Sequence, residues 1–300
     1  MRSESSNRHH GLHEIKGAGA VRTLLDEHGF KFSKSKGQNF LVDANIPEKI
    51  VRLSGIDKNN HVYEVGPGIG ALTAHLCKAA GRVTAVEIDQ RLLPILAVTL
   101  APYSNVDVIH SDILKLNIRE LVEGRGEDLT PCICANLPYS ITTPALTAFV
   151  NAGVFETITV MVQREVARRI CAMPGTSEYG SLSVFINYYA HTEILFEVSP
   201  DCFLPRPEVY SAVVKMKKRT NRTLNPEEEK MFFRIVRASF EQRRKTLVNA
   251  LYAGLNGLLN KEEIAQIIEN CGFDRQLRGE TLGVESFLLL AERILYRKKV

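Results

Sequence analysis

The sequence has no segment typical of membrane or secreted proteins and no cluster of metal ligands. No run of 18 or more apolar residues is present, and the polar stretch 1–13 contains no apolar core of signal-peptide length. The six cysteines include no Cys-x-x-Cys pair, and most stand in apolar surroundings, so we expect buried, reduced side chains. These absences argue against a zinc or disulfide framework. They predict a soluble cytoplasmic protein that binds no metal and no membrane.

Positive charge is concentrated in one part of the chain. Residues 206–245 contain twelve Lys or Arg and five Glu, a surplus of +7, whereas the other 260 residues sum to −3 within a net charge of +4. A second, smaller basic cluster contains Lys31, Lys34 and Lys36. A charge run is usually a solvated face, but a local surplus in an otherwise slightly acidic chain favours a polyanionic partner.

Short β-type runs alternate with amphipathic stretches over much of the chain. This alternation is typical of an α/β protein with a parallel, doubly wound sheet. Residues 180–190 fit either a helix or a strand, and we predict a helix. The predicted strands are 61–65, 82–88, 106–110, 131–135, 157–162, 192–198 and 209–217.

The composition changes after about residue 219. Asn225-Pro226-Glu227 indicates a helix start, with a capping side chain, a proline at the first helical position and an acidic first turn. We therefore expect three parts: a flexible N-terminal segment over 1–20, an α/β domain over 21–220, and a small all-helical domain over 221–300. The predicted helices of the last part are 226–240, 246–255, 261–270 and 284–297.

A glycine-rich turn, Gly66 to Gly70, follows the first predicted strand. Glycine lets the backbone approach a ligand closely, and Glu87 ends the next strand, where a carboxylate can bind ribose hydroxyls. Asp112 ends the third strand, where it can accept from an adenine amino group. Taken singly, these features fit a tight turn with two helix N-caps, or a dinucleotide enzyme. Ligand chemistry at four successive strand ends favours S-adenosylmethionine over NAD.

The fourth of these strand ends is the segment Asn136-Leu137-Pro138-Tyr139. Pro138 fixes its own φ and restricts Leu137 to an extended shape, so the Asn136 side chain and the Leu137 carbonyl can present two acceptors to one NH2 group. Tyr139 can supply a stacking face. The alternative is a plain turn at the end of a strand.

Five segments together resemble one known family, the bacterial small-subunit ribosomal RNA adenine dimethyltransferases (KsgA/RsmA family), and the match spans about residues 20–300. The resemblance implies an α/β, Rossmann-like S-adenosylmethionine-dependent methyltransferase domain with an antiparallel last strand and a helical, RNA-binding C-terminal domain. It also implies dimethylation of two adjacent adenosines in the 3′-terminal hairpin loop of 16S rRNA within the immature small ribosomal subunit, by a monomeric enzyme. The segments are Gly37–Leu41, Glu64–Gly70, Asn136–Tyr139, Phe203–Ser211 and Arg243–Leu251.

The resemblance also assigns roles to individual residues. Tyr139 and Phe203 are expected to sandwich the extruded adenine, although Phe203 also fits a hydrophobic anchor for its loop. Five cationic side chains are expected to contact RNA phosphates: Arg243, Arg244 and Lys245, with Lys34 and Lys36 on an opposite rim. The alternative for the first three is a solvated helix end. Asn136 and Leu137 are expected to be catalytic. The residues expected to bind the cofactor are Asn39, Leu41, Gly66, Gly68, Glu87, Asp112 and Asn136.

Three other functions fit part of the sequence. A large-subunit rRNA methyltransferase of the antibiotic-resistance type shares the cofactor motifs and the turn after the fourth strand, but the Arg243–Leu251 segment resembles the small-subunit family more. An NAD-dependent oxidoreductase is disfavoured because no Tyr-x-x-x-Lys or histidine-based hydride site stands out. A non-catalytic assembly factor is compatible with the enzyme activity.

Overall fold

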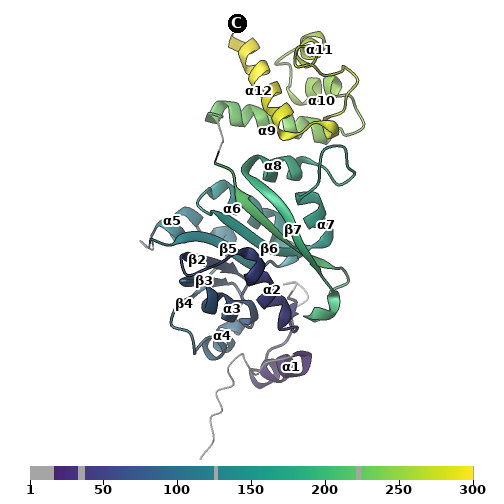
Figure 1. Cartoon of the computed structure of the whole chain (residues 1–300). Coiled ribbons are helices and arrows are strands. Elements are labelled where there is room, and N and C mark those ends of the chain that lie inside the picture. The colour runs from purple at the N-terminus through teal and green to yellow at the C-terminus, as the bar shows by residue number, and fades with distance from the viewer. Residues whose placement is uncertain (1–16, 33–37, 125–127, 221–223, 300) are drawn as a thin grey trace, which may run out of the picture. The chain divides into compact units, whose positions relative to one another are not determined.

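The described part of the chain forms two compact units (Figure 1). The computed structural model describes residues 17–32, 38–124, 128–220 and 224–299. The first unit takes its residues from the chain up to Ala167 and from Glu193–Lys217, and the second from Arg168–Thr192 and the chain after Lys217. The second unit thus includes 168–192, which the sequence analysis assigned to the α/β domain.

A seven-stranded sheet is the centre of the first unit. Its order is β4-β3-β2-β5-β6-β9-β7. The strands β2 to β6 run parallel to their neighbours, whereas β9 runs antiparallel to β6. This confirms the Rossmann-like fold and the antiparallel last strand, and every predicted strand is present. The bounds are β2 (Asn60–Val65), β3 (Arg82–Glu87), β4 (Val106–His110), β5 (Thr130–Asn136), β6 (Thr157–Gln163), β7 (Ala190–Val198) and β9 (Ser211–Lys218).

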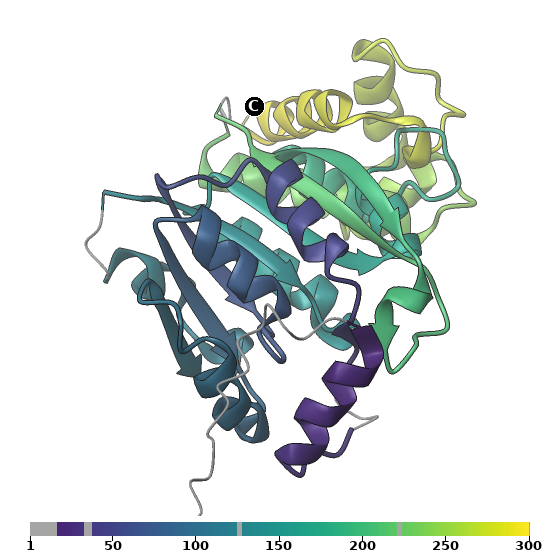
Figure 2. The same cartoon turned by 60° about the horizontal axis from the view of Figure 1, so that its bottom comes forward.

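Helices cover both faces of this sheet, which is why its central strands are buried along nearly their whole length. Figure 2 shows α2 and α3 on one face, while α5 and α6 lie on the other. In β2 and β3 every residue after the first is buried. The helices of this part are α1 (Gly17–Glu27), α2 (Asn45–Ser54), α3 (Ala71–Ala79), α4 (Leu93–Thr99), α5 (Ile118–Glu123) and α6 (Thr142–Ala152), and α7 (Arg164–Ile170) crosses the boundary between the two units.

A second, two-stranded sheet joins segments far apart in the sequence. Strand β1 (Phe40–Leu41) pairs antiparallel with β8 (Phe203–Leu204), and Leu41 lies opposite Phe203. The Val42 N–H extends this connection by donating to the Cys202 carbonyl at 2.9 Å. The pairing fixes the segment that precedes α2 against the connector between β7 and β9.

The second unit is helical and has its own core. As predicted, the first helix after residue 219 begins with a cap: the Asn225 side chain accepts from the N–H groups of Glu227 and Glu228. Residues 168–192 belong here because Tyr179, Val184 and Tyr188 are buried in the same core cluster as the C-terminal helices. The ambiguous stretch 180–190 is a helix, α8, as predicted. The helices are α8 (Ser181–Tyr189), α9 (Pro226–Glu241), α10 (Leu247–Gly254), α11 (Lys261–Asn270) and α12 (Val284–Lys299).

Three of the six cysteines are less buried than the sequence analysis expected, since Cys171, Cys202 and Cys271 are partly exposed. All six cysteines are free thiols, and Cys77, Cys132 and Cys134 are buried. Burial raises the pKa of Cys77 and of Cys132 to about 12, so both are unreactive thiols at neutral pH. Within the described ranges, no helix is long and apolar enough to span a membrane.

Candidate active site

A pocket of about 260 Å³ lies beyond the carboxyl ends of the parallel strands. In an open α/β sheet this edge is where ligands bind, because the strand order reverses there and leaves a crevice. The sequence analysis assigned ten residues to the cofactor or the target base, and all but Phe203 line this pocket. The nine are Asn39, Leu41, Gly66, Gly68, Glu87, Asp112, Asn136, Leu137 and Tyr139.

The glycine turn after β2 has the backbone shape that only glycine adopts readily. Gly66 and Gly68 have φ of +68° and +61°. A Cβ on Gly68 would stand 2.9 Å from a ring carbon of Phe40, and one on Gly66 would stand 3.4 Å from Pro138. Close packing against β1 therefore requires glycine at position 68, whereas at position 66 the positive φ is what favours glycine.

Glu87 ends β3 with its carboxylate held by the backbone. Its Oε1 accepts from the Asp89 N–H at 2.8 Å, and its Oε2 accepts from the Gly68 N–H at 3.3 Å. The residue is 4% exposed, and burial raises its pKa. This carboxylate connects the glycine turn to the end of the next strand and is fixed in direction before any ligand binds. Asp112, in comparison, caps the turn after β4 and accepts from the Leu114 N–H at 3.0 Å.

Glu64, to which the sequence analysis gave no role, is a second carboxylate in the pocket lining. It is 1% exposed, and its Oε2 has no hydrogen-bond partner in the described structure. Burial, with a contribution from the charge of Glu87, raises the pKa of Glu64 to about 8. The signal in the sequence was a glutamate inside a buried strand, since a buried carboxylate is costly unless hydrogen bonds or opposite charge compensate it.

We expect Glu64 to make the stability of the ligand-free protein depend on pH. Because the folded state holds the Glu64 proton more tightly than the unfolded chain, the contribution is present below about pH 4.5 and is lost as the pH rises to about 8. Glu64→Gln should reduce this slope, and Glu87, whose pKa is also raised, should account for part of the remainder. Urea unfolding at several pH values measures how the free energy of unfolding changes with pH in the wild type and in Glu64→Gln. An equal slope in the variant would contradict the assignment.

The Asn136 carboxamide is oriented by its nitrogen. Its Nδ2 donates to the Asn39 carbonyl at 3.4 Å, which directs Oδ1 to accept from elsewhere. The next residue, Leu137, donates its N–H to the Met161 carbonyl at 3.1 Å and so ties the segment to β6. Tyr139 follows in a short turn, and its hydroxyl forms a 2.7 Å hydrogen bond with Ser211 Oγ. The segment predicted to grip an amino group is thus anchored at three points.

Phe203 lies outside the pocket lining. Its side chain is 4% exposed and is buried in the core cluster that contains Leu41, Val62 and Cys132. Its position is explained by β8, which pairs with β1 and turns the ring into the core. In this structure Phe203 anchors its loop, which was the second interpretation of this residue.

The predicted RNA-binding cations lie at the end of α9 in the second unit. Arg243, Arg244 and Lys245 are exposed in the turn between α9 and α10. The Arg243 guanidinium is also held within the unit, where Nη2 donates to the Ser177 carbonyl and to a Glu280 carboxylate oxygen, each at 3.2 Å. Lys34 and Lys36 lie outside the described residues.

The pocket lining offers hydrogen-bond acceptors that suit S-adenosylmethionine. Glu64 Oε2 and Gln38 Oε1 are buried acceptors that have no partner in the described structure, and both residues line the pocket. With the carboxylates of Glu87 and Asp112 they suit a ligand rich in N–H and O–H groups that carries positive charge. A glycine turn, acidic strand ends and an antiparallel last strand together define a Rossmann-like methyltransferase that uses S-adenosylmethionine.

Comparison with known proteins identifies the family. The family model described as ribosomal RNA adenine dimethylase matches residues 29–292. Proteins named ribosomal RNA small subunit methyltransferase A are similar over nearly the whole chain. The one from Anoxybacillus flavithermus is 44% identical over 91% of this chain and 94% of its own length. The one from Clostridioides difficile is 45% identical over 92% of this chain and 95% of its own length. The chain belongs to the ribosomal RNA adenine dimethylase family and is a methyltransferase.

Solved structures agree with this fold. The crystal structure of a dimethyladenosine transferase from Plasmodium falciparum matches with a TM-score of 0.75 and 24% identity, covering 87% of this chain and 98% of that one. The crystal structure of the 23S rRNA methyltransferase ErmE matches with a TM-score of 0.66 and 25% identity, covering 85% and 99%.

Proposed function

We propose that this enzyme converts two adjacent adenosines in the 3′-terminal hairpin loop of 16S rRNA to N6,N6-dimethyladenosine. The observation that carries the proposal is the orientation of Asn136, whose nitrogen is held by the Asn39 carbonyl so that its oxygen can accept from an exocyclic amino group. Membership of the adenine dimethylase family and similarity to small-subunit enzymes support the choice of adenine and of subunit.

The chemistry needs positioning rather than a strong base. S-adenosylmethionine supplies an electrophilic methyl group when bound. The amino group of adenine is a weak nucleophile because its lone pair is delocalised into the ring. Acceptance of its hydrogens by Asn136 Oδ1 and the Leu137 carbonyl favours a pyramidal nitrogen with its lone pair directed at the methyl carbon. In each transfer the nitrogen gains one methyl group and afterwards loses one proton to water. Correct orientation of two reactants can lower the barrier by roughly 7 to 11 kcal/mol.

Stacking on Tyr139 holds the base during transfer. The ring lines the pocket next to Asn136 and Leu137, and stacking of one base on an aromatic side chain contributes about 1 to 3 kcal/mol. Loop adenosines are unpaired, so little energy is lost when they leave the stack. Phe203 can add a second stacking face only if its ring turns out of the core, so we assign the main stacking role to Tyr139.

We further propose that the substrate is the rRNA of an immature small subunit in the cytoplasm, that the enzyme acts as a monomer, and that the helical domain binds RNA. The exposed cations at the end of α9 support the last point. Phosphate contacts of this kind set affinity and salt dependence rather than sequence choice.

One experiment tests the proposed reaction. Small subunits that lack the modification are incubated with the enzyme and methyl-labelled S-adenosylmethionine, and the rRNA is digested to nucleosides and mapped by mass spectrometry. We expect N6,N6-dimethyladenosine at two neighbouring positions near the 3′ end of 16S rRNA. Label in 23S rRNA, or in a base other than adenine, would overturn the proposal.

Charge reversal at the end of α9 should weaken RNA binding in a salt-dependent way. We expect Arg244→Glu with Lys245→Glu to reduce the slope of log affinity against log salt by about 1 to 2, since each phosphate contact releases roughly one counterion. Arg243 is left intact because it also contacts Glu280. The matched control is Lys115→Glu with Arg119→Glu on the exposed surface of the first unit. Equal slopes in both double variants would place the phosphate contacts elsewhere.

A further inference from the structure

We propose that Ser211 is a positioning residue for methyl transfer, and that its hydroxyl anchors the far end of the Tyr139 ring against which the target adenine stacks. This inference rests on the proposed function. Ser211 is the first residue of β9 and is fully buried, and its Oγ lies 2.7 Å from the Tyr139 hydroxyl.

The hydrogen bond spans the carboxyl edge of the sheet. Tyr139 follows β5, Ser211 begins β9, and β6 lies between them in the strand order. Neighbouring strands are about 4.8 Å apart, so the phenol bridges roughly 10 Å across the end of β6. Ser211 lies opposite Gln163, the last residue of β6, which places its hydroxyl at the same edge as the pocket. The ring is therefore held at both ends.

The backbone around Tyr139 does not by itself set the direction in which the side chain points. Two backbone hydrogen bonds fix its turn, both at 3.1 Å. The Leu137 N–H donates to the Met161 carbonyl, and the Ile141 N–H donates to the Pro138 carbonyl. These bonds leave the first side-chain torsion of Tyr139 undetermined, and a contact at the phenol oxygen fixes that torsion. Burial raises the pKa of Tyr139, so the hydroxyl stays protonated at neutral pH and the bond to Ser211 joins two neutral groups.

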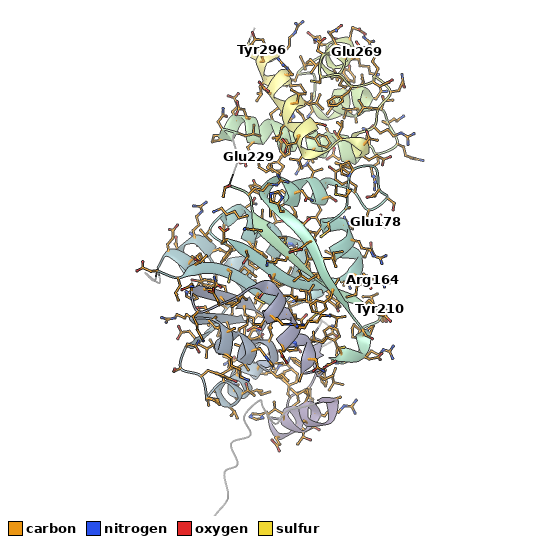
Figure 3. The ribbon with its side chains drawn as sticks, viewed as in Figure 1. Arg164, Glu178, Tyr210, Glu229, Glu269 and Tyr296 are labelled. Carbon is orange, nitrogen blue, oxygen red and sulfur yellow. The ribbon has the colours of Figure 1, made fainter. Side chains whose placement is uncertain are left out.

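The strand end that carries the serine is held by contacts of the residue before it. The preceding residue, Tyr210, accepts from the Arg164 N–H at 2.9 Å, and the Arg164 guanidinium lies over the Tyr210 ring, 4.8 Å from its centroid. Figure 3 shows these two side chains next to each other at the start of β9. Arg164 also pairs with Glu197 at 3.3 Å. A hydroxyl on such a fixed strand end can orient a ring, which a mobile loop could not do.

A double-mutant cycle tests the role. Ser211→Ala and Tyr139→Phe each remove the hydrogen bond from one side and leave the aromatic face. Under single-turnover conditions with saturating cofactor and substrate, each should slow methyl transfer about tenfold, the size expected for one hydrogen bond. The double variant should be no slower than either single one. Affinity for S-adenosylmethionine should stay within about twofold. Thr159→Val, which removes a buried hydroxyl on β6 that has no partner in the described structure, is the control.

A second readout does not depend on activity. With 3-fluorotyrosine incorporated, the fluorine resonance of Tyr139 should broaden or shift in Ser211→Ala and stay unchanged in Thr159→Val. Wild-type rates in both single variants, or losses that multiply to about a hundredfold in the double variant, would overturn the inference. If Ser211→Ala does not fold, Tyr139→Phe alone still tests the proposal, because a wild-type transfer rate in that variant would contradict it. Absence of transfer by the wild-type enzyme would instead refute the proposed function, and the fluorine spectra would still report on the ring.

Discussion

Asn136→Ala should abolish most methyl transfer while the protein continues to bind S-adenosylmethionine. The variant removes the acceptor that holds the adenine amino group but leaves Glu64, Glu87 and the glycine turn in place. Loss of one preorganised group that acts on the reacting atoms typically costs about 100- to 1,000-fold in kcat. We expect a loss of this size in single-turnover assays on unmodified small subunits, with the cofactor dissociation constant changed by less than about threefold.

The control for this variant is Asn151→Ala, which removes the same side chain from an exposed position near the end of α6. Asn136→Asp adds a second test, because a carboxylate can still accept but cannot donate to the Asn39 carbonyl. We expect Asn136→Asp to be impaired as well, since its oxygens lack the anchor that the amide nitrogen provides. Full activity in Asn136→Ala would remove the amine-positioning role.

Glu87→Ala should have its main effect on cofactor affinity. The carboxylate is fixed by the N–H groups of Gly68 and Asp89, and its loss removes both the ligand contact and a connection of the glycine turn. A hydrogen bond to a charged group contributes about 1.5 to 3 kcal/mol, which corresponds to a rise in the dissociation constant of about 10- to 100-fold. Isothermal titration calorimetry with S-adenosylmethionine measures this directly.

Glu123→Ala, at the exposed end of α5, is the matched control and should bind the cofactor normally. Glu87→Gln separates the charge from the contact, because glutamine can still accept one hydrogen bond. We expect an affinity between those of the wild type and Glu87→Ala. Unchanged affinity in Glu87→Ala would count against the ribose assignment.

Much of the site could be predicted because its residues follow buried strands. Glu87, Asp112 and Asn136 each stand just after or at the end of an apolar run, and the ends of parallel strands meet at one edge of a sheet. The glycine turn could be predicted from residue type alone, since its positive φ values favour glycine. Local pattern and one topological rule were therefore sufficient.

The remaining features depend on contacts between distant segments, which local patterns do not encode. The burial of Phe203 results from pairing of β8 with β1, and the contact of Ser211 with Tyr139 results from the order of β5, β6 and β9. The assignment of 168–192 to the helical unit likewise depends on packing of Tyr179 and Tyr188 in its core. A glutamate at position 64 inside a predicted strand was visible in the sequence, but the lack of a hydrogen-bond partner for its Oε2 in the described structure was not.

The two-residue pairing of β1 with β8 has a consequence for deletions. Gln38, Asn39, Phe40 and Leu41 all line the cofactor pocket, yet none of them belongs to the seven-stranded sheet. A chain shortened to begin at α2 would therefore keep every strand of the large sheet and still lose one wall of its binding cavity. The same deletion would remove Phe40 and Leu41 from the cores in which they are buried, so loss of the cavity wall and loss of stability would occur together.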